Sequence, residues 1–201
     1  PLGNKKKFGE DTLKRIATQN TANQFDLLLA DTLTAQTNLF GAITSVETNS
    51  AIQKARTLSV DNLIASFTAR NTRLNKYLEA NDTNKLPVYL EFFPQGVTAF
   101  TREITKGNLQ QRMQEMVTAI TANTAVAGGA AVLTEYQAFL TGYSTARGDQ
   151  LTKISDVSSG RTDRENKEAV WDDQMFENLL TFANLNRGNP GALILFMNQS
   201  I

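Results

Sequence analysis

Apolar residues recur with a helical period along most of this chain, and that pattern limits the fold more than any other feature. The clearest stretch is 61–80, where apolar positions alternate at spacings of four and three. Such spacing places side chains on one face of a helix, where they can pack against a neighbour. The positions on this face are Leu63, Phe67, Arg70, Leu74 and Tyr77 or Leu78. Arg70 is the only charged residue among them, and we expect it to reach a carboxylate or the solvent.

Comparable stripes predict further helices, separated by segments rich in polar or small residues. The predicted helices cover 10–46, 98–124, 132–157 and 164–186. Breaks are expected at 48–50, 81–85, 125–131 and 158–163, where Asn, Ser, Thr and Gly gather. The sequence therefore predicts an all-α fold, an antiparallel bundle of four to five long helices.

Two short apolar segments follow predicted helices and resemble each other. The first plug, 86–97, is the densest apolar segment of the first half, and the second plug, 191–201, ends the chain. Aligning Phe92 with Phe196, a shift of 104 positions, also pairs Phe93 with Met197. We interpret this pairing as an internal duplication with halves 10–97 and 98–201, each closed by its plug.

The first nine residues look different from the rest. Pro1, Leu2 and Gly3 resemble the remnant of a cleaved purification tag, and a basic NKKKF segment follows. A contact of this segment with nucleic acid or lipid is one alternative, but a solvated terminus is the simpler interpretation. We therefore expect 1–9 to be a flexible lead-in and 10–201 to form a single helical domain.

Composition excludes several kinds of chemistry. The chain contains no histidine and no cysteine, which rules out catalytic triads based on histidine, thiol nucleophiles and histidine- or thiolate-ligated metals within it. Lys plus Arg equals Asp plus Glu at 20 each, so the net charge gives no attraction to nucleic acid. The least polar stretch, 124–133, is about half of the roughly 20 residues that a membrane-spanning helix needs. A membrane-spanning helix is therefore not expected.

The plugs are the candidate interaction surface. Two adjacent phenylalanines cannot both face one core from a regular helix, so one of them could contact a partner. The alternative is that the plugs cap the bundle and bury their rings. The candidate residues are Phe92, Phe93, Pro94, Gln95, Phe196 and Met197.

Two other groups of residues have simpler explanations. Glu165, Glu168 and Asp172 share a helical face that could hold a hard cation, but interleaved basic residues favour a salt-bridged surface. The aromatic side chains of the later helices could line a ligand pocket, yet their spacing follows the core stripes. They are Tyr77, Tyr136, Tyr143 and Trp171. No catalytic, metal or cofactor site is predicted.

These observations favour a non-enzymatic structural or protein-interaction bundle that binds a protein partner or associates with itself. The alternative is a small-ligand-binding protein with an aromatic interior, or a membrane-active protein that uses the Ala/Gly-rich segment 125–131 as an inserting hairpin.

Overall fold

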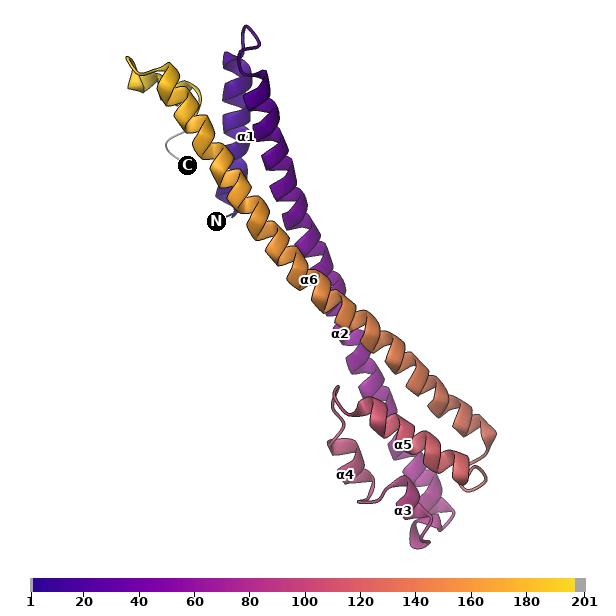
Figure 1. Ribbon diagram of the computed structural model, residues 1–201. Coiled ribbons are helices and arrows are strands. Elements are labelled where there is room, and N and C mark those ends of the chain that lie inside the picture. Colours follow the sequence, from indigo (N-terminus) through magenta and orange to yellow (C-terminus); the bar gives the residue numbers. More distant parts are fainter. Residues whose placement is uncertain (1, 198–201) are drawn as a thin grey trace. The chain divides into compact units, whose positions relative to one another are not determined.

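Helices form all the regular structure in the part of the chain that is described, residues 2–197 of a computed structural model (Figure 1). This confirms the all-α prediction. In chain order the elements are α1 (Leu2–Gln19), α2 (Asp26–Ala80), the 3-10 turn η1 (Thr83–Lys85), α3 (Tyr89–Phe92), α4 (Val97–Arg102), α5 (Leu109–Ala122), α6 (Ala130–Leu185) and the 3-10 turn η2 (Pro190–Leu195). Two of them, α2 and α6, are far longer than predicted, at 55 and 56 residues.

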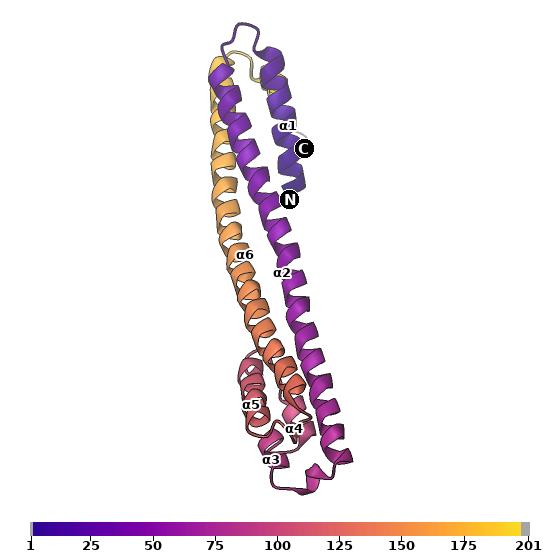
Figure 2. The ribbon, with the colours of Figure 1, turned by 90° about the vertical axis from the view of Figure 1, so that its right-hand side faces the viewer.

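Contacts divide the chain into two units. Unit 1 contains residues 1–50 and 156–201, and unit 2 contains residues 51–155. Unit 1 combines α1, the start of α2, the end of α6 and η2. Unit 2 combines the end of α2, the start of α6 and the elements from η1 to α5 (Figure 2). Each unit thus takes elements from both proposed halves of the sequence, and the single domain over 10–201 stays a prediction.

The long helices are held by a seam with a strict spacing of seven residues. Every seventh residue of each helix is buried or half-buried: Thr32, Leu39, Val46, Gln53, Val60, Phe67 and Leu74 in α2, and Tyr136, Tyr143, Gln150, Val157, Arg164, Trp171 and Asn178 in α6. This spacing keeps one face of a slightly underwound helix against its partner, as in a coiled coil.

The helices are antiparallel within each unit, since Asn178 bonds to Thr32 in unit 1 and Gln150 to Thr57 in unit 2, in addition to the contacts that follow. In unit 1, the Trp171 Nε1–H donates to Gln36 Oε1 at 2.7 Å. In unit 2, the Tyr136 hydroxyl donates to Asn71 Oδ1 at 2.8 Å, and an edge-to-face contact joins the Phe67 and Tyr136 rings at 5.8 Å. The predicted breaks at 48–50 and 158–163 are wrong, because the seam continues through both and packing outweighs weak local helix propensity.

The predicted helix over 10–46 is also wrong, because a turn at 20–25 separates α1 from α2. Asn20 organises this turn. Its Oδ1 accepts a hydrogen bond from the Phe25 backbone N–H at 2.8 Å, and its Nδ2 donates to Asp26 Oδ1 at 2.6 Å. Asn23 has a left-handed backbone with φ 59°, which asparagine tolerates better than most residues.

The expected flexible lead-in is helical, since α1 begins at Leu2. The Lys5 ammonium lies 2.6 Å from an Asp172 oxygen and 2.9 Å from a Glu168 oxygen. Desolvation acts to lower the pKa of Lys5, but hydrogen bonds and charge attraction to these two carboxylates outweigh it and raise that pKa. Phe8 packs edge-on against Trp171, with ring centroids 6.2 Å apart. These contacts fix the start of the chain to α6.

A glycine permits the close approach of α1 to α2. Gly9 is buried, and a Cβ atom at this position would collide with the side chain of Gln36. Gln36 is the residue that accepts the hydrogen bond from Trp171. Any larger residue at position 9 would therefore disturb the contact between α1 and the seam of unit 1.

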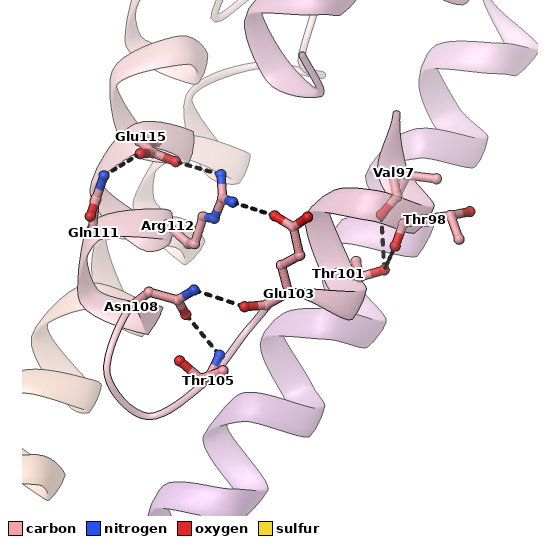
Figure 3. Close-up of polar contacts among 9 residues, drawn as sticks. All are labelled: Val97, Thr98, Thr101, Glu103, Thr105, Asn108, Gln111, Arg112 and Glu115. Carbon is pink, nitrogen blue, oxygen red and sulfur yellow. Dashed lines mark hydrogen bonds and ion pairs between the residues drawn. The ribbon is translucent and has the colours of Figure 1, made fainter. Parts of the chain in front are cut away.

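The predicted helix over 98–124 is interrupted between Arg102 and Leu109. Asn108 stabilises the interruption: its Oδ1 accepts from the Thr105 backbone N–H and its Nδ2 donates to the Glu103 carbonyl, both at 2.7 Å (Figure 3). Glu103 of this loop lines a small pocket beside the site described next.

A shift of 104 positions relates the elements of the two sequence halves. Helix α2 begins at Asp26 and α6 at Ala130. All fourteen seam residues named above form seven pairs at this shift, from Thr32 and Tyr136 to Leu74 and Asn178. Buried positions of the short helices follow the same shift: Gly9, Thr12 and Ile16 in α1, and Met113, Met116 and Ile120 in α5.

Candidate functional site: a groove beside the first plug

Both phenylalanines of the first plug are buried. Phe92 is 1% exposed and Phe93 is fully buried. They achieve this because α3 ends at Phe92, and Phe93 leaves the helix with φ −134° and ψ 78°. The Phe93 ring packs against Tyr89 and Phe100, with centroids 5.6 and 5.7 Å away. The rings are therefore core, as in the second of the two alternatives, while Pro94 and Gln95 are exposed.

The second plug belongs to a different unit. Phe196 stacks on Phe182 at 4.1 Å between ring centroids, and Met197 is buried beside them in unit 1. The six candidate residues thus fall into two separate groups rather than one site. The rest of the second plug, 198–201, lies outside the described residues.

A groove of about 570 Å³ opens between the first plug and α5 in unit 2. Its apolar lining comes from Phe92, Pro94, Phe100, Ala119 and Ala122. Its polar lining comes from Glu91, Gln111, Gln114, Glu115 and Thr118. Apart from Ala119, which is itself buried, the α5 residues among these lie on the side of the helix opposite its buried residues, so α5 presents one face to the core and another to the groove.

The groove carries negative charge. Its lining residues include two carboxylates, Glu91 and Glu115, and no cation. One Glu91 oxygen accepts a hydrogen bond from Asn123 Nδ2 at 2.8 Å, a neutral donor. Glu115 accepts from Gln111 Nε2 at 2.8 Å and lies 3.2 Å from the Arg112 guanidinium (Figure 3).

Arg112 connects the polar residues behind the groove. Its guanidinium also lies 2.9 Å from a Glu103 carboxylate oxygen (Figure 3). The guanidinium carbon lies 5.1 Å from the centre of the Phe100 ring. A small pocket of about 60 Å³ adjoins this arrangement, lined by Pro94, Gln95, Phe100, Glu103 and Arg112. This pocket shares Pro94 and Phe100 with the main groove, so Gln95 lies next to the groove.

The loop that ends in α5 is tied to both long helices. The Tyr143 hydroxyl donates to the Lys106 carbonyl at 2.6 Å, and the Lys106 ammonium lies 2.6 Å from an Asp61 oxygen. Burial raises the pKa of the Tyr143 hydroxyl, which favours its neutral, donating form. These ties hold the start of α5 in place.

Unit 1 contains a counterpart of this groove. A pocket of about 300 Å³ lies between α1 and the second plug, lined by Asp11, Lys14, Arg15, Thr18, Gln19 and Leu195. A shift of 104 positions relates Asp11 to Glu115, Arg15 to Ala119, Thr18 to Ala122 and Glu91 to Leu195.

Arg15 spans the pocket of unit 1. Its Nε donates to Asp11 Oδ2 at 2.6 Å, and its Nη1 donates to the Ile194 carbonyl of the second plug at 2.6 Å. Unit 2 has Ala119 at the equivalent position, which leaves a larger opening.

The other candidates from the sequence lie outside this groove, and two of them, Trp171 and Asp172, line a pocket of about 310 Å³ beside α1. No group of three metal-ligating side chains occurs among residues 2–197, and Glu168 and Asp172 pair with Lys5. Tyr136, Tyr143 and Trp171 occupy buried seam positions. Tyr77 is 44% exposed. The expected contact of Arg70 with a carboxylate is confirmed, since its Nε lies 2.7 Å from Glu135 Oε2.

The Ala/Gly-rich segment is a packed turn between α5 and α6. Gly128 and Gly129 adopt positive φ values near 100°, and Ala127 is 1% exposed. Across the part of the chain that the structure describes, no helix is both long enough and apolar enough to span a membrane.

No family model matches the chain, and searches of curated proteins and of solved structures gave no significant match.

Sequence reasoning identified the plug side of the groove but missed α5. A sequence pattern for the α5 side of the groove was present. Small residues at Thr118, Ala119 and Ala122 form a second stripe on this helix, opposite Met113 and Val117. Such a stripe becomes meaningful only when a neighbouring segment is known to lie beside it.

Proposed function

We propose that this protein is a non-enzymatic interaction module, and that the groove of unit 2 docks a segment of a partner protein. The observation that carries the proposal is the apolar floor of the groove, made by Phe92, Phe100 and the small residues of α5. Protein partners commonly place an apolar side chain into such a pocket and surround it with polar contacts.

The polar lining supports binding rather than catalysis. Two carboxylates, two glutamine amides and one threonine hydroxyl line the groove. Glu115 is engaged with Gln111 and Arg112, and Glu91 accepts a hydrogen bond from the Asn123 amide. Amides and carboxylates held in this way offer hydrogen bonds to a partner backbone or side chain.

We further propose that the scaffold arose by internal duplication. The supporting observation is the common shift of 104 positions, which relates the seam residues, the buried residues of α1 and α5, and the plug residues Phe92 and Phe196. In this view the two units are equivalent, and each combines the short helix of one half with the plug of the other. The structural role of the protein is then to present two related grooves that differ in their lining.

Small-ligand binding is the second candidate. Its support is the volume of the groove, about 570 Å³, which falls within the range of roughly 300–1,000 Å³ typical of small-molecule sites.

A matched pair of tryptophan variants tests the docking proposal. Gln114 lines the groove, whereas Gln110 is exposed on the same helix and does not line it. Peptides selected from a random dodecamer library on the wild-type protein would be titrated against Gln114→Trp and Gln110→Trp by fluorescence polarisation. We expect Gln114→Trp to weaken binding at least tenfold, since the indole fills the groove, and Gln110→Trp to leave it unchanged.

Equal affinity of the selected peptides for both variants would contradict docking in the groove. If the library yields no groove binder but small aromatic fragments shift the Gln114 and Thr118 amide resonances, the small-ligand candidate gains instead. Far-ultraviolet circular dichroism of both variants confirms that the helices are intact.

A further inference from the structure

We infer that the groove of unit 2 receives an arginine side chain from the partner, in the way that Arg15 fills the counterpart groove of unit 1. The inference rests on the proposed docking function and names the chemistry of the docked segment. Its basis is a template within the same chain.

The template is the contact set of Arg15. Its guanidinium is held between a carboxylate on α1, Asp11, and a backbone carbonyl of the second plug, that of Ile194. The side chain is about one-third exposed, so its stem lies along the pocket while its head group is bound at the edge. An arginine is therefore accommodated between a short helix and a plug in this scaffold.

Unit 2 keeps the acceptor but lacks the arginine. Glu115 stands at the position equivalent to Asp11, while Ala119 replaces Arg15. The volume of the groove is correspondingly larger, about 570 Å³ against about 300 Å³. In unit 2 the guanidinium beside this carboxylate is that of Arg112, 3.2 Å from Glu115. The carboxylate that borders the groove without a cation beside it is Glu91, whose partner is the neutral Asn123 amide.

The charged residues that line the two pockets also favour a cationic ligand in unit 2. The pocket of unit 1 contains Lys14 and Arg15 beside a single carboxylate, Asp11. The groove of unit 2 contains two carboxylates, because Glu91 replaces Leu195, and no cation. Because Arg112 pairs with Glu115 behind the groove, the attraction of the unit 2 groove for a cation comes from Glu91, whereas the lining of unit 1 already contains two cations.

Arginine fits this groove better than lysine. Its planar guanidinium can bind a carboxylate through two donors and can stack on an aromatic ring. The groove offers a carboxylate in Glu91, and its aromatic residues Phe92 and Phe100 are 1% and 4% exposed, so the carboxylate contact rather than ring stacking favours arginine. Arg112 already lies over the Phe100 ring at 5.1 Å, so this aromatic environment accepts a guanidinium elsewhere.

The test uses three peptides that differ at one residue. Acetyl-Leu-Arg-Leu-amide would be compared with its citrulline analogue, which has the same shape without the charge, and with its lysine analogue. Each is titrated into the isotope-labelled full chain, and the amide resonances of Gln114, Thr118 and Ala122 are followed. We expect the arginine peptide to bind about fivefold more tightly than the citrulline peptide, the upper range for an exposed ion pair. This preference should disappear in Glu91→Gln and weaken as salt is added.

Two variants use the internal template directly. Ala119→Arg should fill the groove as Arg15 does and abolish the shifts, whereas Gln110→Arg, an arginine on α5 outside the groove, should not. Arg15→Ala should open the pocket of unit 1, so that the arginine peptide also shifts the Thr18 and Leu195 amides. Arg15→Ala keeps the test decisive if Ala119→Arg does not fold.

Equal binding of the arginine and citrulline peptides would overturn the inference and leave the docking proposal standing. The absence of shifts at the groove with the arginine peptide would overturn it as well. The docking proposal itself is judged separately, by whether library-selected peptides lose affinity for Gln114→Trp.

Discussion

Tyr136 shows how single residues specify this fold. Its ring is fully buried in the seam of unit 2, and its hydroxyl donates to Asn71 Oδ1 at 2.8 Å. The Asn71 side chain is also fully buried, and its Nδ2 has no hydrogen-bond partner. A buried amide with one unsatisfied group depends strongly on the hydrogen bond that it does make.

Replacing Tyr136 by phenylalanine should therefore lower the free energy of unfolding by about 1–3 kcal/mol, since Asn71 would then lack both partners. Urea denaturation followed by circular dichroism measures the change. Tyr77→Phe is the control, because Tyr77 is 44% exposed. A loss of equal size in the control would contradict the explanation.

The same residue predicts a dependence of stability on pH. Burial raises the pKa of the Tyr136 hydroxyl well above the value of about 10 expected in the unfolded chain. The stabilisation is therefore complete below pH ~10 and is lost as the pH rises further, at up to about 1.4 kcal/mol per pH unit. Tyr136→Phe should reduce this alkaline loss, measured as the difference in unfolding free energy between pH 8 and pH 11. If Tyr136→Phe loses as much unfolding free energy between pH 8 and pH 11 as the wild-type protein, titratable groups other than Tyr136 cause the loss.

At the scale of elements, the seam between α2 and α6 changes character near the limits of the two units. Large apolar residues occupy the seam on either side, but Gln53, Thr57 and Gln150 lie between them. Gln150 is 3% exposed, and its Nε2 donates to Thr57 Oγ1 at 2.9 Å. Its Oε1 accepts from Arg147. Such a polar layer fixes the register of paired helices at some cost in stability.

A double-mutant cycle tests this layer. Thr57→Val removes the acceptor for the buried Gln150 amide and should destabilise the protein by about 1–2 kcal/mol. Adding Gln150→Leu to Thr57→Val should recover most of the lost unfolding free energy, because the double variant no longer buries an amide without an acceptor. Unfolding free energies from urea denaturation give the coupling energy. Additive effects of the two substitutions would show that the hydrogen bond contributes little.

At the scale of the whole molecule, each unit depends on both halves of the sequence. The core of unit 1 combines Ile16 and Phe25 with Phe182, and the core of unit 2 combines Phe67 with Tyr136. Neither half of the chain contains a complete core of either unit. Folding therefore requires both halves, even though the elements of each half follow the same order.

Fragment complementation follows from this arrangement. Residues 1–96 and 97–201, produced separately, should each be largely unfolded, since each would leave the apolar seam of its long helix uncovered. Mixing them should restore the helical circular dichroism signal and give a 1:1 complex in sedimentation equilibrium. A monomeric half with the full helical signal would show that one half is sufficient and would contradict the shared cores.

The sequence alone determined the helical class, the apolar plugs and the shift of 104 positions between them, because periodicity and composition are local properties. It misplaced the helix boundaries, because the weak propensity of segments 48–50 and 158–163 suggested breaks where the seam continues. It also left open whether Phe92 and Phe93 are core or surface, since this depends on where the backbone leaves α3. Only the tertiary structure placed α5 beside the first plug and Arg15 beside the second. A groove is formed by segments far apart in sequence, so its volume and charge arise from packing that no single segment encodes.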